Sequence, residues 1–197
     1  MYIGCTNMKK ISLATIILLT ASSAMAESQI QVGLGYTRTT VSGTDNGSGY
    51  EEYVNAPALV ARYAFSNNIA IEGAYRFKSG DTCDWDNGNS CTENPRVQVN
   101  GIDINLLLGD HFIDQDHFYY FAGVGFFSDN WNRRKYNRKD TISGAHFPFG
   151  LGYNTGKFSL ETQYTYRLGS AYDNGLNGYF ETDTSAYSLA LKLMYSL

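Results

Sequence analysis

The chain has 197 residues, which is enough for one domain, and a formal net charge of −4 from 15 basic and 19 acidic residues. This balance argues against nucleic acid as the main partner, because nucleic-acid-binding surfaces are usually basic. The 16 Tyr, 20 Gly and 3 Pro residues favour strands and turns over helices.

The N-terminal segment has the pattern of a secretory signal peptide. Two lysines precede an apolar run, Ile11–Leu19, and the small-x-small sequence Ala24-Met25-Ala26 follows it as a cleavage site. The run has about half of the ~20 residues that a membrane-spanning helix needs. We therefore predict a signal peptide over residues 1–26, with Met8 as the true start, and one domain over residues 27–197. A buried N-terminal helix is the alternative.

Alternation of apolar and polar residues with a period of two predicts eight strands along this domain. The pattern is clear in five segments and weaker in the second, fifth and sixth. In chain order the segments are Gln29–Thr37, Tyr50–Phe65, Ile69–Lys78, Gly101–Gly109, His117–Ser128, Thr141–Tyr153, Lys157–Leu168 and Thr184–Leu197.

The connections between these strands alternate in length. Asn67-Asn68 and Asn154–Gly156 are tight turns and Asp110–Asp116 is of moderate length, whereas the loops between them are longer and polar. The long loops are Val41–Gly49, Gly80–Asn94, Asp129–Lys139 and Ser170–Asp183. Short turns on one side, long loops on the other and aromatic residues near the strand ends are typical of outer-membrane barrels. A secreted β-sandwich, with the apolar faces as its core, is the alternative.

In such a barrel the apolar face of each strand contacts lipid. The charged residues that alternate with the apolar ones must then point into the barrel, because a lipid-facing Lys at mid-membrane costs about 2–4 kcal/mol. This inward set holds five positive and three negative side chains. Its members are Arg62, Glu72, Arg76, Lys78, Asp103, Glu161, Arg167 and Lys192. Eight strands enclose a lumen that side chains can fill, so we expect a packed, ion-paired interior. A proton or ion relay is the alternative role for these charges.

Segments such as "FYYFAGVGFF" and "PFGLGYNTGKFSLETQYTYRL" resemble the small outer-membrane β-barrel family, which includes the barrel of outer membrane protein A and the protein X/Ail group. The resemblance covers residues 27–197 and implies an all-β, eight-stranded antiparallel up-and-down transmembrane barrel. It also implies an integral protein of a Gram-negative outer membrane, with extracellular loops and with turns and both mature termini in the periplasm. The last strand resembles the signal that the barrel-assembly machinery reads, although family members usually end in Phe and this chain ends in Leu197.

Two cysteines remain after removal of the signal peptide. Cys83 and Cys91 flank the polar, turn-prone segment "DWDNGNS". Secretion implies an oxidising compartment, so we predict a disulfide that closes this loop. We expect no metal or other cofactor: two cysteines without further ligands do not make a zinc site, and the carboxylate spacing of the loop is wrong for calcium.

An enzyme that modifies lipid A is the alternative from another class. A deacylase of that kind needs a Ser nucleophile beside a His base, which His and Ser two residues apart on a strand would supply. The three histidines, His111, His117 and His146, are followed two residues later by Ile, Tyr and Pro. The sequence therefore favours a non-enzymatic protein, with His146 in the lumen and the other two beside a turn.

The most distinctive loop, "DNWNRRKYNRKD", carries Arg133, Arg134, Lys135, Arg138 and Lys139. These cations could bridge the phosphates of neighbouring lipopolysaccharide, or they could bind anionic host or matrix polymers, as the Ail-type resemblance suggests. We expect a protein that supports envelope integrity and presents surface loops for adhesion. A narrow porin-like channel is a further alternative.

Overall fold

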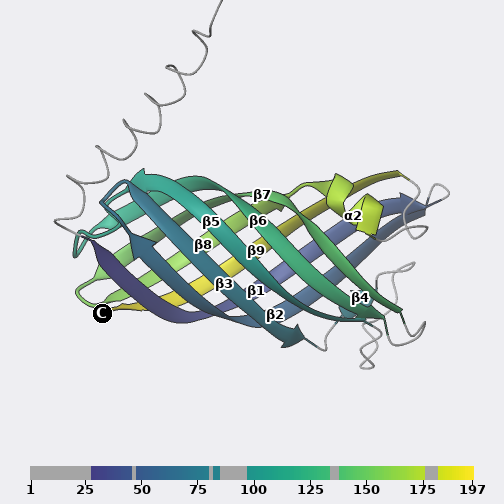
Figure 1. Ribbon diagram of the computed structural model, residues 1–197, viewed down its shortest axis with the longest axis horizontal. Helices are drawn as coiled ribbons and strands as arrows, with labels where there is room; N and C mark the ends of the chain where they lie inside the picture. Colours follow the sequence, from purple (N-terminus) through teal and green to yellow (C-terminus); the bar gives the residue numbers. More distant parts are fainter. Residues whose placement is uncertain (1–27, 46–47, 80–81, 85–96, 134–137, 176–181) are drawn as a thin grey trace, which may run out of the picture.

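The computed structural model describes residues 28–45, 48–79, 82–84, 97–133, 138–175 and 182–197. These residues form eight long strands, one short strand and one short helix (Figure 1). The long strands are β1 (Gln29–Asp45), β2 (Ser48–Ala64), β3 (Ile69–Ser79), β5 (Val97–Asp110), β6 (Phe118–Arg133), β7 (Arg138–Thr155), β8 (Phe158–Arg167) and β9 (Thr182–Ser196). The short elements are β4 (Thr82–Asp84) and the helix α2 (Gly169–Gly175).

The eight long strands close into an antiparallel barrel. Each pairs with its neighbours in the chain, and β1 pairs with both β2 and β9, which joins the two ends of the sheet. The short strand β4 pairs with β2 at Glu52–Val54. This stretch precedes Ala58–Ala64, the part of β2 that pairs with β3. Closure leaves no free edge in the middle of the barrel, as a membrane-spanning sheet requires. The predicted eight-stranded up-and-down barrel is confirmed.

The strand ends separate into two sets. The connections that span residues 65–68, 111–117 and 156–157 lie at one end of the barrel together with the chain's C-terminus, and we call this the turn end. The hairpins β1–β2 and β6–β7, together with α2, lie at the other end, which we call the loop end (Figure 1). Gly156 has a φ of +54°, the left-handed conformation that a tight turn places on glycine.

A belt of large apolar side chains covers the outside of the barrel at the turn end and middle. Leu34, Leu160 and Leu191 are 67%, 53% and 53% exposed, and every long strand contributes to the same surface. Aromatic pairs such as Phe158–Tyr195, with ring centroids 5.3 Å apart, lie near its rim. A contiguous apolar surface of this size on a closed barrel is the surface that lipid covers in transmembrane barrels.

Toward the loop end of the strands, apolar side chains point inward and polar side chains point outward, the reverse of the arrangement in the belt. On β6, Phe126 is exposed on the outside, but Phe127 and Trp131 are buried inside while Ser128 and Asn130 face outward. The same change occurs on other strands, where the inward apolar side chains are Val41, Val54, Val99, Ile142 and Ala186. The strands therefore continue past the apolar belt into water, with a small apolar core inside them.

This extension corrects two of the predicted loops. Most of Val41–Gly49 belongs to β1 and β2, which pair out to Asp45 and Ser48. Likewise, much of Asp129–Lys139 is paired strand, from Asp129 to Arg133 and from Arg138 onward. Sequence periodicity places the strand ends too early because the outward residues become polar there, although the inward residues keep the strands packed.

The predicted loop Ser170–Asp183 also differs, because it begins with the helix α2. Among the described residues, no helix has the length and hydropathy needed to cross a membrane. The predicted signal peptide, residues 1–26, lies outside the described residues.

Candidate functional site in the barrel lumen

Four charged side chains form a closed ring of ion pairs in the lumen. Arg62 of β2 lies 2.5 Å from a carboxylate oxygen of Glu72 on β3 and 2.6 Å from one of Glu161 on β8. Lys192 of β9 contacts the other oxygens of the same two acids, at 2.7 Å and 2.9 Å. Positive and negative groups alternate around this ring, which we call the first quartet.

A second quartet lies nearer the loop end. Arg76 of β3 pairs with Asp103 of β5 and with Asp129 of β6. Arg167 of β8 contacts the same two acids, with nitrogen–oxygen distances of 3.0 Å to each. Arg167 also donates to the hydroxyl of Ser188 at 3.0 Å. Each arginine therefore bridges two acids, and each acid bridges two arginines.

Neutral side chains add hydrogen bonds to the quartets, although Nε of Arg76 is buried without a hydrogen-bond partner among the described residues. Tyr119 donates to Glu161 at 2.9 Å, and Gln163 accepts from Lys192 at 2.5 Å. The amide of Asn105 donates to Glu72 at 3.2 Å, and its oxygen lies 2.5 Å from Nε2 of His146, whose other ring nitrogen is 3.9 Å from Asp103 of the second quartet. Buried charges are costly unless their remaining lone pairs and protons are satisfied, and these contacts satisfy most of them.

The two quartets contain four positive and four negative groups, which differs from the predicted set. Asp129 is fully buried in the second quartet, although we had assigned it to a loop. Lys78, which we had assigned to the lumen, is exposed near the end of β3, and within the described part of the chain no ion pair joins it to either quartet. The other seven predicted residues all lie in the quartets.

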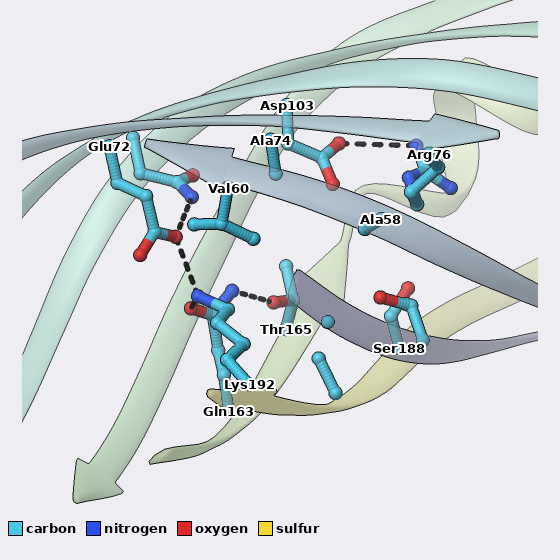
Figure 2. Close-up of a pocket in the computed structure, with 14 residues that line it drawn as sticks. Ala58, Val60, Glu72, Ala74, Arg76, Asp103, Gln163, Thr165, Ser188 and Lys192 are labelled. Atoms are coloured by element: carbon cyan, nitrogen blue, oxygen red, sulfur yellow. Dashed lines mark hydrogen bonds and ion pairs between the residues drawn. The ribbon is translucent and has the colours of Figure 1, made fainter. Parts of the chain in front are cut away.

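A small cavity of about 20 Å³ lies beside the quartets. Figure 2 shows Lys192 pointing toward Glu72, and Arg76 toward Asp103, around this space. The small side chain of Ala58 also lines it. A space of this size holds about one water molecule, so the described side chains fill the lumen around the quartets.

Apolar clusters close the lumen at both ends. At the loop end, Tyr172 of α2 is buried against the rings of Phe127 and Trp131, with centroids 5.6 Å and 6.2 Å away. At the turn end, Phe112 is buried with Tyr119 and Phe121. We call these clusters the loop-end plug and the turn-end plug. The charged groups between the plugs are thereby largely buried, with the Asp103 side chain retaining 14% exposure.

The segment that carries Phe112 is fixed by hydrogen bonds. The amide of Asn154 donates to the carbonyl oxygens of His111 and Asp114, each at 3.0 Å. Asn67 donates to a carboxylate oxygen of Asp114 at 2.9 Å and accepts from the backbone of Ile113 at 3.0 Å. The turn end is therefore an ordered cap.

Two histidines lie together on this cap. Nδ1 of His111 lies 2.6 Å from the Asp114 carboxylate, and the rings of His111 and His117 stack with centroids 4.9 Å apart. The hydrogen bond to Asp114, together with the charge of Asp110, raises the pKa of His111 above its ordinary value, and the same bond lowers the pKa of Asp114. The third histidine, His146, is buried in the lumen.

The basic loop lies only partly within the described residues. Arg133 and Arg138 pair as the last backbone partners of β6 and β7, and Lys139 is exposed opposite Asn132. Arg134 and Lys135 lie outside the described residues. Of the predicted disulfide, Cys83 is in β4, whose backbone pairs with β2, and Cys91 lies outside the described residues. No group of three or more potential ligands for a metal ion occurs in the part of the chain that the structure describes.

Several lumen residues were missed from sequence: Asn105, Tyr119, Asp129, Gln163, Tyr172 and Ser188. A signal existed for three of them, since Asn105, Gln163 and Ser188 occupy the inward phase of predicted strands. Tyr119, Asp129 and Tyr172 gave no such signal, because a tyrosine fits either face and the other two positions lay in predicted loops.

Comparison with solved structures shows which fold this is. Neisserial surface protein A matches with a TM-score of 0.54 at 12% identity, covering 85% of this chain and 97% of that one. Outer membrane protein OprG of Pseudomonas aeruginosa matches with a TM-score of 0.52 at 10% identity, covering 86% and 96%. Ail of Yersinia pestis has a TM-score of 0.46 at 14% identity, covering 86% and 97%. No family model and no curated protein sequence matches the chain.

Proposed function

We propose that this chain, which has the fold of the small outer-membrane β-barrels, is an integral protein of a Gram-negative outer membrane. Residues 1–26 direct its export and are then cleaved, and the barrel-assembly machinery folds it. The loop end then faces the outside of the cell and the turn end faces the periplasm. The short turns support this orientation, because outer-membrane barrels have short turns on the periplasmic side.

The closed lumen is the observation that supports a function at the outer surface of the barrel. Within the described residues, two apolar plugs and a charge-balanced centre leave no path for a solute, and the cavity beside the quartets holds about one water molecule. The protein therefore acts through its outer surface and not as a channel. It stabilises the envelope as a rigid barrel and presents its loop end for adhesion.

A non-enzymatic role is supported by the position of the histidines. A lipid-directed base would need to lie on the outside of the barrel near its rim. His146 is buried in the lumen, and His111 and His117 lie on the turn-end cap. Mass spectrometry of lipid A from a deletion strain tests this: the proposal expects an unaltered lipid A profile, and a changed acyl chain number would contradict it.

The basic hairpin between β6 and β7 is the candidate binding surface. Arg133 and Arg138 are backbone partners where β6 and β7 reach the loop end, and the exposed Lys139 follows. With Arg134 and Lys135, the hairpin gathers five basic residues within seven positions. Such a cluster attracts sulfated or phosphorylated polymers, including lipopolysaccharide and host or matrix glycans.

Replacing the five basic residues with Ser tests this binding role. Heparin retention and adhesion of cells that express the variant should both fall strongly, while the variant still migrates as a folded barrel before boiling. A matched variant in which Lys78 and Lys157 are replaced should bind as the unaltered protein does. Unchanged heparin retention and adhesion in the five-residue variant would rule out the basic hairpin as the adhesive surface.

A further inference from the structure

A groove of about 460 Å³ lies on the outside of the barrel, within the apolar belt. It runs over β1, β9 and β8, where Tyr36 pairs with Leu191 and Leu191 pairs with Thr162. The groove forms because Thr162 is short, whereas the next outward residue of β8, Tyr164, is large and lies opposite Leu189. Its apolar walls and its position in the belt suit a hydrocarbon chain.

A cation stands at the loop-end rim of this groove. Arg38 lines it, lies two residues beyond Tyr36 on the same face of β1, and is exposed. Its guanidinium carbon lies 4.3 Å from the centre of the Tyr53 ring, which holds the side chain against the barrel. The nearby carboxylate of Glu51 accepts a hydrogen bond from the hydroxyl of Tyr53. Among the described residues, Arg38 forms no ion pair.

The position of Arg38 coincides with the end of the apolar belt. Its backbone partner on β2 is the polar Asn55, and the next pair on the same face toward the loop end is Thr40 and Tyr53, so the aliphatic part of the belt stops at this level. A guanidinium at this depth keeps several N–H donors directed to the level of lipid head groups. Phosphate oxygens at that level accept bidentate hydrogen bonds from arginine.

A second groove provides a comparison within the same molecule. It measures about 420 Å³ and lies over β1, β2, β3 and β5 beside Ala61 and Gly73. The charged residues at its base, Arg62 and Glu72, belong to the first quartet and are buried inside the barrel. This groove can accommodate a hydrocarbon chain, but it offers no cation to a head group.

From these contacts we infer that the groove beside Arg38 is a site for one phosphate-bearing lipid of the leaflet at the loop end. The lipid's acyl chain occupies the groove over Thr162 and Leu191, and its phosphate is bound by Arg38. This site is distinct from the basic hairpin and does not depend on the proposed adhesive role.

Native mass spectrometry of the detergent-solubilised folded protein tests the site, with dioleoyl phosphatidic acid as the probe and dioleoylglycerol as its phosphate-free match. We expect one phosphatidic acid to be retained in preference to dioleoylglycerol, and inorganic phosphate alone not to be retained. Arg38→Gln should lower retention about tenfold, as expected for loss of a hydrogen bond between charged groups. Thr162→Leu, which fills the groove, should lower retention of the lipid as well.

Three variants serve as controls. Lys157→Gln removes a matched cation at the turn end, which lies 5.8 Å from the centre of the Tyr195 ring, and Ala61→Leu fills the second groove. Both should retain phosphatidic acid as the unaltered protein does, and so should the variant with five serines in the basic hairpin. Equal retention by Arg38→Gln, equal losses in the Lys157 or Ala61 controls, or equal retention of dioleoylglycerol would each overturn the inference.

Discussion

Individual charged residues stabilise this barrel only as members of closed sets. In each quartet every acid contacts two cations, so removal of one member leaves two partners without full compensation. Breaking a buried pair by removing one partner costs about 3–5 kcal/mol, because an unpaired charge remains buried. The quartets should therefore tolerate single changes far less well than the exposed charges do.

Asp129→Asn tests this at the residue that sequence patterns missed. The change keeps the shape of the side chain but removes the charge that Arg76 and Arg167 share. We expect the free energy of unfolding, measured by urea titration in lipid vesicles, to fall by about 3–5 kcal/mol. Lys78→Gln, at an exposed position, should change it by no more than about 0.5 kcal/mol. Similar effects of the two substitutions would show that the second quartet contributes little.

The turn-end cap should respond to pH through His111 and Asp114. The raised pKa of His111 means that its protonated form stabilises the folded cap fully below the ordinary histidine value, and that this contribution is lost as pH rises through the raised value. The lowered pKa of Asp114 means that its contribution is present above the ordinary Asp value and is lost as pH falls through the lowered value. The ion pair therefore exists between these two limits.

An NMR titration of the His111 ring checks this pH dependence. In the unaltered protein its midpoint should lie above the ordinary value of about 6.5, and Asp114→Asn should move it downward. Asp110, 3.5 Å from the other ring nitrogen, and the stacked His117 remain in the variant, so the return need not be complete. An unmoved midpoint in Asp114→Asn would show that this carboxylate does not hold the proton.

At the scale of elements, the long strands other than β3 and β8 contain two polarity patterns in sequence. The outward residues are apolar where the strand crosses the belt, and the inward residues are apolar where it continues toward the loop end. Sequence periodicity predicted the first part of each strand, because a lipid-facing run such as Ile30–Tyr36 has a clean period of two. It missed the second part, because the phase of the pattern changes within one continuous strand, near Phe126 and Phe127 on β6.

The helix α2 was also missed, since its seven residues carry polar and small side chains and one buried Tyr. Tyr172 has its effect through the loop-end plug, which depends on tertiary packing rather than on any local pattern. Tyr172→Ala should lower the free energy of unfolding by about 3–5 kcal/mol, the range for removal of a large buried aromatic side chain. Tyr166→Ala, on the outer belt, serves as the matched control in the same urea titration and should cost clearly less. Equal costs would mean that the plug is not a packed core.

At the scale of the whole molecule, the sequence is sufficient to predict the strand architecture, but it is insufficient to predict which side chains meet in the lumen. Strand number, order and the two sets of connections follow from local patterns and loop lengths, which a single chain displays directly. Which charges meet depends on the relative position of strands around the barrel. Arg62 and Glu161 are separated by 99 positions, and no local pattern relates them. The exclusion of charge from lipid places seven of the predicted charged residues in the lumen. Lys78 is the exception because it lies near the loop end of β3, where a charged side chain can face water.

The closed lumen makes a prediction for the whole protein in planar bilayers. With both plugs in place we expect no stable single-channel conductance, since aqueous ions would have to cross two apolar clusters. Tyr172→Ala alone should also remain silent, because the turn-end plug around Phe112 persists. Discrete conductance steps in the unaltered protein would support a narrow pore in place of the closed barrel.

The most direct test of the central claim, that lipid covers the apolar belt while the strands beyond it enter water, is spin-label accessibility in vesicles. In a background with Cys83 and Cys91 replaced by Ser, labels are placed singly at Val124 and Leu160 in the belt and at Ser143 on the outward face of β7 beyond it. We predict that Val124 and Leu160 contact dissolved oxygen and are shielded from a water-soluble nickel chelate, with the reverse at Ser143. Nickel contact at Val124 and Leu160 as strong as that at Ser143 would contradict the account.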